Sequence, residues 1–152
     1  MTNLASFASA TPRFGLPLLF PGQAQKEFFV NEAHALLDAM VHACVLGIAD
    51  IPPVGPAEGD AWLVQPDGQG DWSGKGQAIA VFTAGGWRFV VPQHGMQLFD
   101  KALGRFFHFD DIWKYAEEPT QPVGGATVDQ EARATIGQLI MALRAHGILP
   151  RE

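Results

Sequence analysis

The chain has 152 residues, 47% hydrophobic and 17% charged, a balance that supports a buried core and excludes a disordered chain. Its formal net charge of −6 argues against a nucleic-acid partner, because nucleic-acid-binding surfaces are basic. Its single cysteine, Cys44, excludes an internal disulfide framework and a multi-cysteine zinc site. No apolar run reaches the roughly 18 residues of a membrane-spanning helix, so we expect a soluble globular module without membrane insertion.

Residues 1–20 are predicted to form an extended N-terminal arm. The stretch Leu4 to Ala10 lacks the basic start and the continuous apolar run of a signal peptide, so we expect the arm to remain uncleaved. Its second half carries large apolar side chains that would be costly to leave in water. We therefore interpret it as a docking arm, with five candidate partner-binding residues: Phe14, Leu16, Leu18, Leu19 and Phe20.

The pattern from Gln23 to about Ala49 predicts one long helix. Apolar residues recur there at steps of three, four and five, which places them on a single face. Gly47 lies near the expected end, and Pro52-Pro53 prevents the helix from continuing. The residues of this predicted core-facing stripe are Ala24, Phe28, Ala33, Leu36, Leu37, Met40, Val41, Cys44 and Ile48.

After this helix the pattern changes to strands. Ala61 to Val64 predicts a short strand, and residues 66–76 predict a glycine-rich loop. Two hairpins follow. One joins 78–83 to 87–91 through a glycine turn, and the other joins 96–99 to 105–109 through a longer loop. The expected fold of residues 21–115 is therefore α+β, with a long N-terminal helix packed on a small antiparallel β-sheet of hairpins.

Residues 116–126 have the composition of a linker, and residues 127–152 are predicted to hold a C-terminal helix. Thr127 and Gln130 have the spacing of a capping box, and Gly147 suits the C′ position. A helix of this length is marginal alone in water, so its narrow apolar stripe must be buried on the domain, a sister subunit or a partner. The stripe supplies the other candidate partner-binding residues: Ile136, Leu139, Ile140 and Leu143.

The residues reveal no catalytic pattern, and we expect a protein that is not an enzyme and has no cofactor and no metal. His34, Asp38 and His42 share one face of the predicted helix and could hold zinc, but Ala35 follows His34 where the metalloprotease signature has Glu. A solvated or subunit-facing polar stripe explains these three residues better. A metal-dependent hydrolase built on them is therefore the weakest hypothesis.

A carbohydrate-binding module is the alternative function. Aromatic side chains can stack on sugar rings, and Trp72 in the glycine-rich loop is the candidate for an exposed glycan-binding residue. The other tryptophans lie in the strand region, where burial in the core is the usual role of this side chain. This alternative predicts recognition of host cell-surface polysaccharide.

Two segments carry a family resemblance. The first is Gly22 to Glu27, followed by Asn31-Glu32-Ala33 and Leu37-Asp38-Ala39. The second begins at Glu58-Gly59-Asp60 and ends at Pro92, through the segments Asp71-Trp72-Ser73-Gly74, Ile79-Ala80 and Gly86-Trp87-Arg88-Phe89. Together they resemble an uncharacterised domain family of tail-fibre and spike proteins from alphaproteobacterial phages, prophages and gene transfer agents. The C-terminal stretch Asp129 to Gly147 is similar to the tail end of such proteins.

The resemblance implies a virion structural protein. Family members often form the basal domain of a longer fibre, and we expect this chain to lack the long shaft and the receptor-binding tip of such a fibre. We therefore expect the base or adaptor of a capsid (head) spike or tail fibre, made in the bacterial cytoplasm and located on the surface of a phage-like particle. Its expected partners are capsid or tail proteins, a distal spike or fibre protein, and copies of itself in a cyclic homo-oligomer, a trimer or a pentamer.

Overall fold

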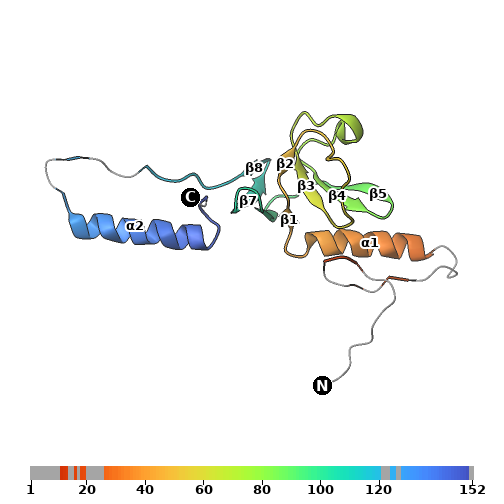
Figure 1. Cartoon of the computed structure of the whole chain (residues 1–152), viewed down its shortest axis with the longest axis horizontal. Helices are drawn as coiled ribbons and strands as arrows, with labels where there is room; N and C mark the ends of the chain where they lie inside the picture. Colours follow the sequence, from red (N-terminus) through yellow and green to blue (C-terminus); the bar gives the residue numbers. More distant parts are fainter. Residues whose placement is uncertain are drawn as a thin grey trace, which may run out of the picture.

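The structure, a computed structural model, describes residues 11–13, 16, 18–19, 26–120, 124–125 and 128–150. Figure 1 shows α1 beside strands β2 to β5 at one end of an elongated molecule, α2 at the other end, and β7 and β8 between them. The elements in the described ranges are α1 (Lys26–Met40), β1 (Cys44–Val45), β2 (Ile48–Ala49), β3 (Ala61–Val64), a short 3-10 helix η1 (Gly70–Trp72), β4 (Ile79–Thr83), β5 (Gly86–Val90), β6 (Gln97–Asp100), β7 (Arg105–Asp110), β8 (Ile112–Lys114) and α2 (Gln130–Ala145).

The strands form two sheets. One has the order β1-β6-β7-β8 and the other has the order β2-β3-β4-β5, with four strands each. The predicted α+β architecture, a long N-terminal helix on one small antiparallel sheet, is therefore wrong, because the fold is mostly β and the first helix is short. Neither sheet is purely antiparallel, since β1 pairs in parallel with β6 and β2 pairs in parallel with β3.

The first helix ends at Met40 and does not continue to Ala49. His42 has a left-handed backbone with φ 51°, a conformation that a helix interior does not accept. Cys44 and Ile48, which a helix would place on one face, belong instead to two strands. Their spacing of four matches the helical period, so the periodicity alone could not separate the two structures, and pairing with distant strands decided the outcome.

The segment 44–49 joins the two sheets. Its first two residues pair with β6 and its last two pair with β3. Between them the Leu46 N–H donates to the Ala61 carbonyl at 2.8 Å, and the Gly47 carbonyl accepts from the Leu63 N–H at 3.0 Å. Val45 is fully buried at this junction. The main core therefore draws on the end of α1 and on both sheets, through Ala39, Ala43, Val45, Ala61, Leu63, Ile79, Val81, Leu98 and Phe107.

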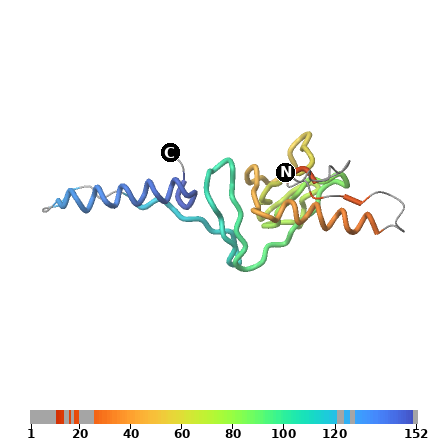
Figure 2. Tube along the Cα trace, turned by 90° about the horizontal axis from the view of Figure 1, so that it is seen from below, coloured from red at the N-terminus to blue at the C-terminus, as the bar shows by residue number. Residues whose placement is uncertain are grey.

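Both predicted hairpins are confirmed. β4 pairs with β5 in antiparallel register, and β6 pairs with β7 in the same way. The short strand predicted at Ala61 to Val64 is also confirmed, as β3. Figure 2 shows the β6–β7 hairpin between the body that contains α1 and the separate rod formed by α2. This hairpin is therefore the platform from which α2 extends.

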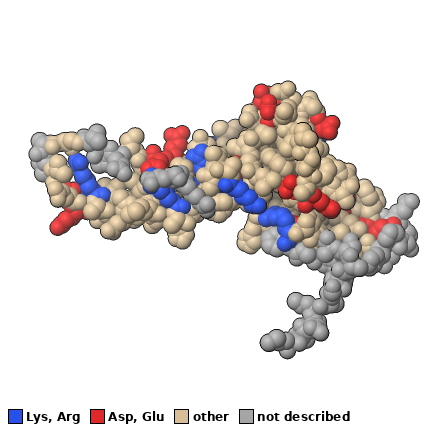
Figure 3. Space-filling model, viewed as in Figure 1, with Lys and Arg blue, Asp and Glu red and all other residues tan. Residues whose placement is uncertain are grey.

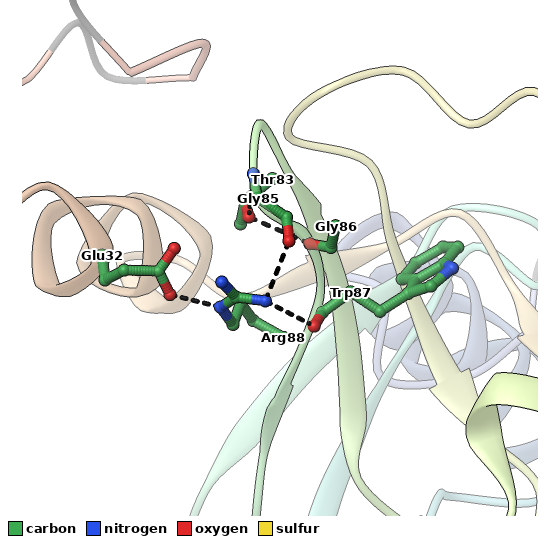
Figure 4. Close-up of polar contacts among 6 residues, drawn as sticks. All are labelled: Glu32, Thr83, Gly85, Gly86, Trp87 and Arg88. Atoms are coloured by element: carbon green, nitrogen blue, oxygen red, sulfur yellow. Dashed lines mark hydrogen bonds and ion pairs between the residues drawn. The ribbon is translucent and has the colours of Figure 1, made fainter. Parts of the chain in front are cut away.

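An ion pair fixes α1 on the β4–β5 hairpin (Figure 4). The guanidinium of Arg88 contacts the Glu32 carboxylate, and it also donates to the Gly85 and Trp87 carbonyls, each at 3.1 Å. The helix buries Asp38 and Ala39 and leaves much of its predicted apolar stripe exposed, including Phe28, Leu37 and Val41. The prediction that this stripe faces the core is therefore wrong.

The C-terminal helix is confirmed, although it begins later than predicted. Asp129 is the N-cap, and its side chain accepts from the Ala132 N–H at 2.9 Å, so the predicted capping box of Thr127 and Gln130 is wrong. The residue Thr127 itself lies outside the described residues. Gly147 has φ 71° and occupies the C′ position as predicted. The Gly147 N–H donates to Arg144 and the Ile148 N–H donates to Leu143, the two bonds of a Schellman motif.

The same glycine attaches α2 to the platform. The carbonyl of Gly147 accepts from the Phe106 N–H at 2.7 Å. A Cβ at position 147 would lie 3.0 Å from the ring of Phe99, so the close approach itself requires glycine. Leu149 is buried beyond it. The C-terminal end of α2 is thereby held on the β6–β7 hairpin.

Candidate assembly surfaces

The described part of the N-terminal arm is anchored to α1 by a buried carboxylate. The Thr11 hydroxyl donates to Asp38 Oδ1 at 2.7 Å, and the backbone N–H of Arg13 donates to Asp38 Oδ2 at 2.9 Å. The Thr11 hydroxyl also accepts from the Leu16 N–H at 3.0 Å, which closes the turn. Asp38 and Thr11 are both buried, so these bonds are costly to lose.

The guanidinium of Arg13 caps the C-terminal end of α1. It donates to the carbonyls of Asp38 and Ala39 at 2.9 and 2.8 Å, and to the His42 carbonyl at 2.9 Å. The last carbonyls of a helix lack partners within the helix and carry its negative dipole end, so a cation stabilises them. The arm therefore both contacts the helix and helps to end it.

A second contact holds the arm further along α1. The side-chain amide of Asn31 accepts from the Leu19 N–H at 2.8 Å and donates to the Leu19 carbonyl at 3.1 Å, as a neighbouring strand would. Leu16, Leu18 and Leu19 are half-buried there. The remaining two predicted arm residues, Phe14 and Phe20, lie outside the described residues.

A hollow lies between the arm, α1 and the tip of the β4–β5 hairpin. Its volume is about 510 Å³. Leu18, Leu19 and Phe28 supply apolar walls, and Glu27 and Glu58 supply carboxylates. The hollow can therefore accept an apolar side chain from a partner that carries basic groups beside it.

The outer face of α1 continues this apolar surface. Phe29 is 73% exposed, and Leu37 on the helix and Val41 just beyond its end each have about half of the side chain in water. Phe28 and Phe29 stack edge to face, with ring centroids 5.6 Å apart. Phe29 was not among the predicted surface residues, although two adjacent phenylalanines on a helix cannot both face one core.

The linker covers one face of α2. The Arg144 guanidinium contacts the Glu118 carboxylate near one end of the helix, and Arg133 donates to the Gly124 carbonyl at 2.6 Å near the other. Between them lie Gly137 and Ile140, and Ile140 is only 6% exposed. Spacings of four, three and four place these side chains on one side of the helix. Of the four predicted stripe residues, Ile140 is therefore already buried within the chain.

The other three stripe residues of α2 are uncovered. Ile136, Leu139 and Leu143 are 45%, 59% and 38% exposed, and Ala132 extends the same line toward the start of the helix. Burying the exposed remainder of each large side chain would contribute roughly 1 kcal/mol, since complete burial of such a residue contributes about 1.5–3 kcal/mol. The predicted assembly stripe is thus present as a surface.

The structure contradicts the exposed position predicted for Trp72, the residue on which the glycan-binding alternative was based. Trp72 is fully buried, with its ring 5.1 Å from that of Trp87, so the prediction that Trp72 is exposed is wrong. The indole belongs to a buried cluster with Val64 and Ala80. A Cβ at Gly68 would lie 2.7 Å from the Trp72 carbonyl oxygen, which explains the glycine there. Trp72 therefore cannot stack on a sugar ring in this fold.

The three residues of the weak zinc hypothesis do not share a helix face. His42 lies beyond the end of α1, and Asp38 is buried among its bonds to the arm. In the described parts of the chain, no group of three or more metal-ligating side chains is placed to hold an ion. A search of the same residues finds no helix with the length and apolar character needed to cross a bilayer.

Residues 30–114 match the DUF2793 family, described as proteins of unknown function, and this match covers more than half of the chain. The chain therefore belongs to this family. No curated protein matches it. The matched region contains both sheets and most of α1, whereas the arm and α2 lie outside it. Both predicted partner-binding segments thus lie outside the matched residues.

We predict that Thr11→Val weakens the anchor of the arm. Valine keeps the shape of threonine but removes the donor to Asp38 and the acceptor for the Leu16 N–H. The free energy of unfolding, measured by urea denaturation, should fall by about 1–3 kcal/mol because a buried carboxylate loses a partner. The control is Thr135→Val, at an exposed position on α2, which should change it by less than about 0.5 kcal/mol. Equal effects of the two variants would contradict the proposed anchor.

We also predict that the linker detaches from α2 at low pH. The hydrogen bond from Arg144 lowers the pKa of Glu118 below its ordinary value of 4.5, an effect that desolvation partly opposes. Because the folded pKa is the lower one, the contact contributes fully above pH 4.5 and is lost as the pH falls through the folded value. Amide chemical shifts of residues 116–118 and 120 should report this loss in an NMR titration.

The matched variants for this titration are Glu118→Gln and Glu117→Gln. The first removes the titrating partner of Arg144, so the shifts at neutral pH should already resemble those of the acid form. The second changes the neighbouring exposed glutamate and should leave the transition in place. A transition that survives Glu118→Gln would show that another group controls the linker.

Proposed function

We propose that the chain is a non-enzymatic structural component of a phage-like particle, either a gene transfer agent or a prophage product. In this proposal it is the base or adaptor of a capsid spike or tail fibre on the particle surface, and it acts by protein–protein assembly as a cyclic homo-oligomer. Host attachment is then the task of the distal protein that it holds.

The observation that carries this proposal is the separation of two apolar surfaces. One surface combines the arm with the outer face of α1, and the other is the uncovered stripe of α2 (Figure 1). An adaptor has to bind two neighbours at once, and two docking surfaces at opposite ends of an elongated chain suit that task. The family-like segments in residues 22–92 point in the same direction.

The arm surface is the side we assign to the particle. Its hollow offers leucine and phenylalanine walls beside the carboxylates of Glu27 and Glu58. The matching partner is a capsid or tail protein that presents an apolar side chain flanked by basic residues. The distal spike or fibre protein then lies beyond α2.

The test determines whether the chain is present in particles made by the bacterium that encodes it. After induction, nuclease-resistant particles are purified on a density gradient and probed with an antibody to the chain, and immunogold labelling locates it. We expect the chain to sediment with the capsid protein. Its complete absence from the particle fractions, with abundant chain left in the lysate, would overturn the proposal.

A matched pair of variants tests the assigned surface. Leu18→Glu places a charge in the hollow, and we expect a folded chain that is depleted at least tenfold from particles. Leu103→Glu introduces the same charge at a partly exposed leucine outside the hollow and should not change incorporation. Normal incorporation of Leu18→Glu would show that the particle contact lies elsewhere.

A further inference from the structure

The two sides of α2 differ in what covers them. The side formed by Arg133, Gly137, Ile140 and Arg144 faces the linker. The stripe Ala132, Ile136, Leu139 and Leu143 lies about a quarter turn away and faces no described part of the chain closely enough to be covered. Because the linker holds the first side, rotation of the helix cannot bury the stripe within the same chain.

The stripe has the spacing of a helix–helix seam. Its residues follow each other at steps of four, three and four, which is the heptad alternation of positions that interdigitate with a like helix. Ile136, Leu139 and Leu143 supply the large side chains of this seam, and the small Ala132 extends it. A flat sheet surface or an unstructured segment would not require this alternation.

The charges on α2 also fit a contact with itself. Arg133 and Arg144 are engaged on the linker side. The outer flank of the stripe carries Val128, Thr135 and Ala142, all uncharged, and Glu131 lies on the far side of that flank. Asp129 and His146 lie at the two ends of the stripe, so the uncharged part is the middle of the helix. Figure 3 shows a largely uncharged surface between the charged groups near the two ends of α2.

This lack of charge matters for the choice of partner. When parallel like helices pack around an axis, the side chains beside the seam of one helix meet those beside the seam of the next, so charges of one sign there would repel one another. The uncharged line of Val128, Thr135 and Ala142 presents no such charge to a neighbouring copy, and it offers none with which a foreign charged helix could pair. The flank of α2 therefore fits a second copy of this chain.

We infer that the stripe of α2 is the self-association seam of the chain, which packs parallel α2 helices of several copies around a common axis. This inference rests on the proposed function and deepens it, because it names the surface that builds the cyclic base. The attachment of each α2 at Gly147 to its own β6–β7 hairpin then places the β-sheet bodies side by side around one end of the helical bundle.

The test is the solution mass of the full-length chain, measured by light scattering after size exclusion. The wild type should be a discrete oligomer of at least three copies, and Leu139→Glu should be a monomer. Met141→Glu is the matched control, because Met141 is 60% exposed on the opposite side of the same helix and the added charge is identical. It should remain an oligomer.

Each alternative result contradicts the inference. A monomeric wild type would show that the stripe does not join copies, and an oligomeric Leu139→Glu would show that another surface does. If Met141→Glu lost assembly to the same degree as Leu139→Glu, the loss would not be specific to the stripe side of the helix. Leu139→Gln, a neutral variant, is measured alongside and should also be shifted toward monomer.

Two measurements distinguish a failure of this inference from a failure of the proposed function on which it rests. Tryptophan fluorescence reports the β-sheet body, which contains Trp62, Trp72 and Trp87, and it should be unchanged in every α2 variant if the body stays folded. Incorporation into particles is measured separately from solution mass. A chain that is found in particles, yet is monomeric both in solution and in the particle, would contradict self-association through the stripe. The proposed structural role would then still stand.

Discussion

The buried carboxylate of Asp38 is the constraint on which the rest of the chain depends. It receives the Thr11 hydroxyl and the Arg13 N–H, and this places the Arg13 guanidinium against the last carbonyls of α1. The helix ends there, the chain turns through the left-handed His42, and residues 44–49 connect the two sheets. One polar contact thus couples the position of the arm, the length of the helix and the junction of the sheets.

The two ends of the molecule are built differently, and this difference supports the proposed division of tasks. The arm end is tied to the body by buried hydrogen bonds and by the Glu32–Arg88 ion pair. At the other end, α2 is attached through the Gly147 turn and the linker, so most of its surface is free of the body. A fixed end suits attachment to a particle, whereas an extended helix suits contact with further copies.

The sequence predicted local structure well and long-range structure poorly. Both hairpins were predictable because glycine turns separate β-favouring residues, and Gly147 was predictable because a helix end commonly needs a left-handed residue. The short strands β1 and β2 were not predictable. Their two residues each gain strand geometry from partners about 55 and 15 positions away, and Cys44 and Ile48 fit a helical period equally well.

The environment of single side chains on the candidate surfaces was not predictable, because it depends on contacts between residues far apart in the chain. Trp72 was expected in water because its loop is rich in glycine, yet it belongs to a buried cluster with Val64 and Ala80. Ile140 is covered on the side of α2 that the linker contacts, which the helical pattern did not indicate. Ile136 and Leu139 lie on one face of α2, as helical periodicity predicts.

The most direct measurement of the central claim is disulfide cross-linking between copies through α2. The chain has one natural cysteine, so Cys44→Ser combined with Leu139→Cys gives a single thiol on the seam, and Cys44→Ser with Met141→Cys gives a single thiol on the opposite side. In a parallel bundle, equivalent seam positions face each other across the axis. Mild oxidation should therefore join chains through position 139 and leave those with the thiol at position 141 unjoined. Equal cross-linking at both positions, or none at position 139, would contradict self-association through α2.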